Sequence, residues 1–291
     1  MSKPKILVQL DTDEQPSVFD GVVAVDAGVD HLFRHGNVDP VGVRDLVFGA
    51  IFTRGLDDLK SSAIFIGGSD VSAGETLLAA VKNTMFGPLR ISIMLDSNGA
   101  NTTASAAVLA AARHVLLPDA EALVLAGTGP VGSRVVRLLA AEGVQVRVGS
   151  RTLARAEATC DSVCKRVPRA RVRAVETASP NATAAALDGV QFVIAAGTPG
   201  VELLAADARL AARALKVAID LNAVPPLGIG GGEATDKAIE REGVIFYGAI
   251  GVGGDKMKIH KAAIRQLFES NDQVLDAEEV YRIGKQLAAS S

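Results

Sequence analysis

One short segment, Gly127-Thr-Gly129-Pro-Val-Gly132, restricts the possible folds of this chain more than any other feature. It follows an apolar run at residues 122–126 that is typical of a buried strand, and it leads into a helical pattern from residue 131 to 141. In this setting the first glycine permits a tight turn, the second lets the backbone approach a pyrophosphate, and the third lets the helix pack closely on the strand. A purely structural glycine turn is the alternative. The residues expected around the pyrophosphate are Gly127, Thr128, Gly129, Pro130, Val131 and Gly132.

Short apolar runs continue this alternation through the C-terminal part of the chain. They predict strands at residues 122–126, 144–148, 171–175, 192–196, 217–219 and 244–246, with helical patterns between most of them. Six strands in this rhythm predict an α/β fold with a Rossmann-type, doubly wound parallel sheet. After Gly254 we expect a helix that leaves this sheet.

The N-terminal part predicts a smaller α/β domain. Strands are expected at residues 6–10, 63–66 and 91–95, with a weaker candidate at 22–25. Helix starts are predicted at Asp39-Pro40, at a capping box from Ser72 to Glu75, and in the Ala-rich segment after residue 103. We therefore expect a substrate domain at residues 1–104, joined by a C-terminal helix within 271–291, and an NADP-binding domain at 105–270. A cleft is expected between them.

Composition excludes several classes of protein. The 291 residues carry 30 Lys and Arg against 33 Asp and Glu, a net charge of −3, which does not favour a nucleic-acid partner. No apolar run is long enough for a membrane span, and the N-terminus lacks a signal peptide pattern. Cys160 and Cys164 are expected as reduced thiols, and His31 and His35 lack a third ligand for a metal. These features predict a cytoplasmic protein with no metal.

The end of the strand after the glycine segment indicates the type of cofactor. An NAD-preferring site has Asp or Glu about 20 residues after the first glycine, whereas this chain has Ser150-Arg151-Thr152, with Arg155 one turn later. An Arg fork pairs with a 2′-phosphate, so we expect NADP, the alternative being a solvated basic loop. The loops after later strands are expected to line the ribose and nicotinamide, through Ala196, Gly197, Asn222, Ile250 and Gly253.

Four further segments carry a family resemblance. They are Gln9-Leu-Asp-Thr-Asp with Pro16-Ser-Val-Phe-Asp20, Leu95-Asp-Ser-Asn-Gly with Asn101-Thr-Thr, the segment from Leu125 to Gly132, and Pro225-Pro-Leu-Gly-Ile-Gly-Gly231. With residues 251–260, they resemble the bacterial NADP-dependent methylene-tetrahydromethanopterin dehydrogenases. These enzymes are similar to methylene-tetrahydrofolate dehydrogenases and serve one-carbon metabolism in methylotrophs.

The resemblance implies oxidation of a methylene-tetrahydropterin to its methenyl form with reduction of NADP+. Because a hydride leaves and no proton has to be removed, no acid–base pair is required. Lys256 is implied as the active-site lysine that orients the substrate. Asp20 is the first candidate to accept the adjacent N–H groups of a pterin, with Asp96, Asp11 and Asp13 as weaker ones. Asn98, Asn101 and Thr102 are further substrate candidates, or else turn and N-cap residues. A homo-oligomer is also implied, with a trimer as one candidate.

Two other functions stay open at this point. The Ser-Arg-Thr loop also suits shikimate-type or glutamyl-tRNA-reductase-type NADP oxidoreductases, although the N-terminal domain has no Cys. A non-catalytic NADPH-sensing protein is the alternative from another class. Aromatic residues make up only 4% of the chain, with no Trp, so a pterin site is expected to consist of backbone, small residues, carboxylates and lysines.

Overall fold

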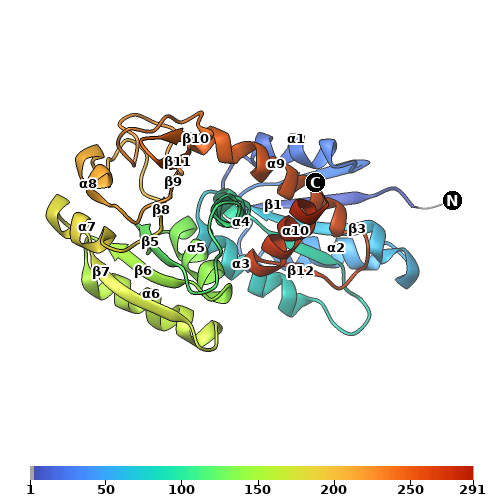
Figure 1. Ribbon diagram of the computed structural model, residues 1–291. Coiled ribbons are helices and arrows are strands. Elements are labelled where there is room, and N and C mark those ends of the chain that lie inside the picture. The colour runs from blue at the N-terminus through green and yellow to red at the C-terminus, as the bar shows by residue number, and fades with distance from the viewer. Residues whose placement is uncertain (1–2, 291) are drawn as a thin grey trace. The chain divides into compact units, whose positions relative to one another are not determined.

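The computed structural model describes residues 3–290 (Figure 1). The chain forms two compact units, the first containing residues up to Thr102 together with those from Met257 onward, and the second containing Thr103–Lys256. Two helices, α4 (Ala100–Ala112) and α9 (Ala249–Gln266), contain the boundaries. The chain therefore returns to the first unit within α9, whereas the sequence placed the end of the second domain at residue 270.

The first unit is built on a five-stranded, fully parallel sheet with the order β12-β4-β3-β1-β2. Its strands are β1 (Ile6–Asp11), β2 (His31–His35), β3 (Ser62–Gly67), β4 (Ser92–Leu95) and β12 (Val274–Leu275). Its helices are α1 (Val18–Asp26), α2 (Val43–Phe52), α3 (Val71–Thr84) and α10 (Ala277–Ala289), with two 3-10 helices, η1 (Leu56–Ser61) and η2 (Ser97–Gly99). Buried aliphatic residues of the sheet and of α2 and α3 form one core cluster.

The second unit contains a seven-stranded sheet with the order β10-β11-β9-β8-β5-β6-β7. Its strands are β5 (Glu121–Leu125), β6 (Gln145–Ser150), β7 (Arg171–Glu176), β8 (Phe192–Ala195), β9 (Val217–Asp220), β10 (Lys237–Arg241) and β11 (Val244–Tyr247). Its helices are α5 (Pro130–Ala141), α6 (Leu153–Arg166), α7 (Pro180–Leu187) and α8 (Ala206–Ala211). Except for the antiparallel edge strand β10, all strands are parallel, and the predicted doubly wound sheet is confirmed.

The predicted strand at residues 22–25 is wrong, because this segment belongs to α1. The hydroxyl of Ser17 accepts a hydrogen bond from the backbone N–H of Asp20 and caps the helix, which overrides the strand preference of the valines. Gly21 and Val23 face the interior, whereas Val22 is 56% exposed.

Two predicted helix starts also differ from the structure. Asp39 accepts hydrogen bonds from the backbone N–H groups of Val41 and Gly42, so Asp39-Pro40 forms a turn before α2, which begins at Val43. Helix α3 is capped by Asp70, whose carboxylate accepts from two backbone N–H groups in the first turn. Ser72 therefore lies inside the helix and does not form the predicted capping box.

Within residues 3–290, no helix combines the length and the apolar character that a membrane crossing requires.

Candidate functional site

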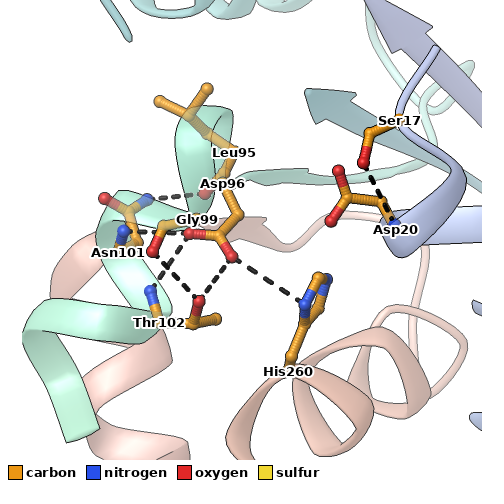
Figure 2. A network of polar contacts seen from close by, with 8 residues as sticks. All are labelled: Ser17, Asp20, Leu95, Asp96, Gly99, Asn101, Thr102 and His260. Atoms are coloured by element: carbon orange, nitrogen blue, oxygen red, sulfur yellow. Dashed lines mark hydrogen bonds and ion pairs between the residues drawn. The ribbon is translucent and has the colours of Figure 1, made fainter. Parts of the chain in front are cut away.

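In the first unit, a buried carboxylate organises the segment that follows β4. Asp96 is 1% exposed. Its Oδ1 accepts hydrogen bonds from the backbone N–H groups of Asn101 (2.9 Å) and Thr102 (3.1 Å), and its Oδ2 accepts one from the Thr102 hydroxyl (2.7 Å). Figure 2 shows these contacts converging on the one carboxylate. Asp96 thus fixes the start of α4 by binding the N–H groups that a helix leaves unpaired at its N-terminus.

The neighbouring predicted residues differ in their surroundings. The amide of Asn101 donates to the carbonyl of Leu95 (2.5 Å) and to Oδ1 of Asp276 (3.1 Å), the N-cap of α10. Asn101 and Thr102 are fully buried, and their recorded bonds stabilise the fold around α4. Asn98 is exposed and has a positive φ of 53°, as expected for a turn residue. These contacts match the alternative prediction, in which Asn98 is a turn residue and Asn101 and Thr102 belong to the capped start of α4.

His260 joins this site and was missed at the sequence level. It lies in α9 with no exposed surface, and its Nδ1 is 4.0 Å from Oδ2 of Asp96. Its ring stacks on that of Phe65 in β3, with centroids 5.5 Å apart and planes 22° apart. A single histidine in a helical pattern gives no sequence signal, because its partners lie far away in the chain.

Asp20, the first carboxylate candidate, lies in the first turn of α1 and is half-buried. The loop before it is tightly held. Buried Asp11 accepts from the backbone N–H of Ser17 (3.1 Å), and Gln9 donates to the Ser17 carbonyl (3.3 Å). Arg34 in turn donates to the Gln9 side-chain oxygen (3.1 Å). These contacts fix the point at which α1 begins and hence the position of Asp20, whose carboxylate points toward the side of Asp96 and His260 in Figure 2.

The topology of the first unit supports a ligand site at this edge. Its strand order follows the flavodoxin-like pattern, in which ligands bind outside the C-terminal ends of the strands at the point where the order reverses, between β1 and β3. Asp11 and Gly67 pair in register at these ends. Asp13, in the loop after β1, accepts from the backbone N–H and the hydroxyl of Ser69 after β3 (both 2.9 Å). Asp11 and Asp13 are thus engaged in holding the loops that surround this edge.

In the second unit, the glycine segment has the geometry that its sequence predicts. It joins β5 to α5, with Gly129 as the N-cap and Pro130 as the first helical residue. A Cβ at Gly132 would lie 2.4 Å from the Ala126 carbonyl oxygen, and one at Gly127 would lie 3.0 Å from the Val124 carbonyl oxygen. The helix therefore starts in close contact with the turn, and its N-terminal N–H groups and positive dipole end suit a pyrophosphate.

The predicted 2′-phosphate residues follow the neighbouring strand β6. Ser150 ends this strand with 6% exposure and accepts from the backbone N–H of Thr152, the N-cap of α6. Arg151, Thr152 and Arg155 are exposed around the N-terminus of this helix. Two cations and a helix N-terminus at one place form a suitable environment for a phosphate dianion.

The remaining cofactor candidates follow β8, β9 and β11, at the same edge of the parallel sheet. Ala196 and Gly197 come directly after β8 and are half-buried. Asn222 is 3% exposed, and its side chain bonds the backbone of its own loop, donating to the Pro226 carbonyl and accepting from the Val224 N–H. Asp220, at the end of β9, also holds this loop, and burial raises its pKa.

The segment at residues 248–254 is not the glycine-rich loop that the sequence predicted. Helix α9 already begins at Ala249, so Ile250 and Gly253 lie in its first turns, directly after β11. A Cβ at Gly251 would lie 1.8 Å from the Asp236 carbonyl oxygen, which shows that glycine serves a close backbone approach here. Lys256 lies further along the same helix, half-buried and one turn before His260.

Among residues 3–290, no group of three or more His, Cys, Asp or Glu side chains is arranged to hold a metal ion. His31 and His35 occupy the two ends of strand β2. Four residues span about 13 Å in a strand, which is too far for a shared ion.

The chain is similar in sequence to known proteins over nearly its whole length. A family model described as methylene-tetrahydromethanopterin dehydrogenase, N-terminal, matches residues 18–98. The bifunctional protein MdtA of Methylorubrum extorquens AM1 is 49% identical over 290 residues, covering 99% of this chain and 100% of that protein. The NAD(P)-dependent methylenetetrahydromethanopterin dehydrogenase of the same organism is 29% identical over 293 residues, covering 97% and 98% of the two chains.

Solved structures with low sequence identity share the fold. Shikimate 5-dehydrogenase from Listeria monocytogenes superposes with a TM-score of 0.55 at 14% identity, covering 98% of this chain and 96% of that one. Quinate dehydrogenase from Corynebacterium glutamicum gives a TM-score of 0.53 at 15% identity, covering 98% and 99%. Since the relative with 49% identity covers nearly the whole chain, and the matched segment carries both Asp20 and Asp96, this protein belongs to the methylene-tetrahydromethanopterin dehydrogenase family.

Proposed function

We propose that the protein is an oxidoreductase that transfers a hydride from methylene-tetrahydromethanopterin to NADP+, giving the methenyl form in one-carbon metabolism. The observation that carries this proposal is that the candidate pterin-binding residues and the dinucleotide-binding segment lie in different units. The segment matched by the family model, with Asp20 and Asp96, lies in the first unit, and the dinucleotide fingerprint lies in the second.

The residues of the second unit fit NADP. Because Gly132 lacks a side chain, α5 starts close to the turn after β5, and its first N–H groups can bind a pyrophosphate. The guanidinium groups of Arg151 and Arg155 suit a 2′-phosphate. When bound, this cofactor supplies the hydride acceptor. Ala196, Gly197, Ile250 and Gly253 are assigned to the ribose and nicotinamide by their place after β8 and β11, and Asn222 acts through the loop that it stabilises.

The chain's own task in this reaction is positioning. A hydride leaves a carbon flanked by two nitrogens, and the resulting cation is delocalised over both, so no side chain has to take a proton. Asp20 is assigned to accept N–H groups of the pterin, and Lys256 to orient the substrate and set the local charge. Asp96, Asn101 and Thr102 contribute by fixing the start of α4, and exposed Asn98 is assigned a direct contact.

The test is a direct assay. Purified protein is mixed with NADP+ and methylene-tetrahydromethanopterin, and separately with methylene-tetrahydrofolate, while NADPH absorbance is followed. NADPH formation with the first substrate supports the proposal. If NADPH binds but neither substrate causes turnover, the protein is instead an NADPH-binding regulator, and the proposal fails.

We also propose that the protein is a homo-oligomer. Helix α1 exposes Val18 (70%), Val22 (56%) and Val25 (62%) along one side, more apolar surface than a solvated helix needs. Size-exclusion chromatography with light scattering gives the subunit number, and a monomeric mass would contradict the proposal.

A further inference from the structure

The first turn of α1 exposes an aromatic ring beside the candidate substrate carboxylate. Phe19 is 50% exposed and directly precedes Asp20. Successive residues of a helix point about 100° apart, so the ring and the carboxylate occupy adjoining faces of the same turn. Gln9, itself held by Arg34, binds the Ser17 carbonyl and so fixes where this turn begins, which sets the backbone positions of both residues.

Two further rings lie behind Phe19. Its centroid is 6.4 Å from that of His260, at an interplanar angle of 38°. His260 stacks on Phe65, which is 1% exposed in the central strand β3. The three rings form a row from the core of the first unit to its surface, and Phe19 is the member that reaches solvent. Contacts of this kind restrict the orientation of the outer ring before any ligand arrives.

We propose that Phe19 is the residue on which the flat pterin ring of the substrate stacks, while Asp20 accepts N–H groups at the edge of that ring. This inference rests on the proposed function and assigns the recognition of the pterin to one turn of α1. A planar heterocycle with an apolar face and a donor edge needs an apolar surface and a carboxylate at adjoining positions. It differs from the expectation, drawn from the low aromatic content, that the pterin site contains no aromatic residue.

The experiment compares Phe19→Ala, Phe19→Leu and Phe19→Tyr with the wild type in the NADP+-linked assay with methylene-tetrahydromethanopterin. Stacking of a nucleic-acid base on an aromatic ring is worth roughly 5-fold to 150-fold in binding, so Phe19→Ala is expected to raise KM for the pterin by about tenfold or more. Phe19→Tyr keeps the ring and is expected within about threefold of the wild type. Phe19→Leu keeps apolar area without a flat face and is expected between the two.

The matched control is Phe33→Ala. Phe33 is equally exposed, at 51%, but lies on the edge strand β2 and is not part of the row of rings. It is expected to leave KM for the pterin unchanged. For every variant, the Kd of NADPH and the melting temperature are measured, and both are expected to match the wild type. These two measurements separate pterin stacking from a general effect on folding.

The outcomes are distinct. A rise in pterin KM in the order Tyr, Leu, Ala, with unchanged NADPH binding and unchanged Phe33→Ala kinetics, supports the inference. A turnover-competent wild type whose Phe19→Ala variant behaves like Phe33→Ala overturns it and leaves the proposed function intact. A wild type that turns over no tetrahydropterin overturns both.

Discussion

Nδ1 of His260 lies 4.0 Å from Oδ2 of Asp96, and neither side chain has any surface exposed to solvent. Asp96 follows β4 in the N-terminal part of the chain, whereas His260 comes from α9, more than 160 residues later. The segment matched by the N-terminal family model, residues 18–98, therefore contains only part of this site. The C-terminal segment completes the site, which explains why the first unit includes the residues from Met257 onward.

The Asp96 cluster predicts a specific stability effect at Thr102. The Thr102→Val change keeps the shape but removes the hydroxyl that donates to Asp96 at 2.7 Å. Losing a hydrogen bond to a buried charged group costs about 1.5–3 kcal/mol, so the free energy of unfolding in urea is expected to fall by that amount. Thr102→Ser keeps the hydroxyl and is expected to lose only about 1 kcal/mol for the missing methyl group. Equal stability of the valine variant and the wild type would contradict the assigned role of Asp96.

Central strands were easier to predict from the sequence than edge strands. Central strands such as β5 and β8 are buried on both faces of their sheets, so they read as short apolar runs and were predicted. The edge strands β2 and β10 are largely exposed and carry no such signal, so they were missed. The edge strand β7 is also largely exposed, but it keeps three apolar residues, Val172, Ala174 and Val175, and was predicted. Strand β12 has only two residues, and its pairing with β4 depends on tertiary contacts.

The candidate site shows the same division. The glycine segment was predictable because local steric demands require glycine at Gly127 and Gly132. In contrast, His260 was not predictable, because its contacts with Asp96 and Phe65 join three separate parts of the chain. The start of α9 was misjudged because glycines in a sequence suggest a loop, whereas Gly251 is needed inside this helix for its close approach to Asp236.

Lys256 offers a test of the active-site assignment. Lys256→Met removes the ammonium group but keeps much of the apolar stem, and because the substrate is then poorly oriented, kcat is expected to fall about 100-fold. The Kd of NADPH is expected to stay within a factor of about 2. Lys258→Met, in the same helix but exposed, serves as the control and is expected to retain activity. Similar kcat values for the two variants would remove Lys256 from the site.

The third glycine of the fingerprint predicts a loss of cofactor affinity on substitution. In Gly132→Ala, the new Cβ would lie 2.4 Å from the Ala126 carbonyl oxygen and 2.9 Å from the Gly127 Cα. Because both neighbours are backbone atoms, α5 has to move away from the turn, and NADPH binding measured by fluorescence is expected to weaken by at least about tenfold. Gly49→Ala in α2, where nothing lies within 4 Å, is the control and is expected to leave the Kd unchanged.

Arg151 is expected to distinguish the two nicotinamide cofactors. Arg151→Ala removes a charge-assisted contact to the 2′-phosphate, so the Kd of NADP+ is expected to rise about 10-fold to 100-fold, while that of NAD+ changes by less than about twofold. Calorimetric titration with both cofactors measures the ratio. Arg166→Ala, in the last turn of helix α6, which starts just after Arg151, controls for the general loss of positive charge. Equal losses for both cofactors would show that Arg151 does not bind the 2′-phosphate.

His114 predicts a pH dependence of stability in the second unit. Its Nε2 hydrogen-bonds the Tyr247 hydroxyl at 2.8 Å, while neighbouring Arg113 forms an ion pair with Asp255 at 2.6 Å. Burial, followed by the charge of Arg113, lowers the pKa of His114 below its ordinary value of 6.5. The folded state therefore favours the neutral ring, and its contribution to stability is complete above about pH 6.5.

As the pH falls below this value, the unfolded chain binds the proton more readily than the folded chain, and stability decreases until the folded pKa is passed. Glutamine does not titrate but keeps a hydrogen-bonding side chain, so the His114→Gln variant lacks the pH-dependent loss of stability that His114 causes. The difference in melting temperature between about pH 5 and about pH 8 is expected to be smaller in the variant than in the wild type, by less than about 3 °C. All other residues are identical in the two proteins, so the comparison isolates His114. A larger pH dependence in the variant would mean that the charged ring of His114 is the form that the fold prefers.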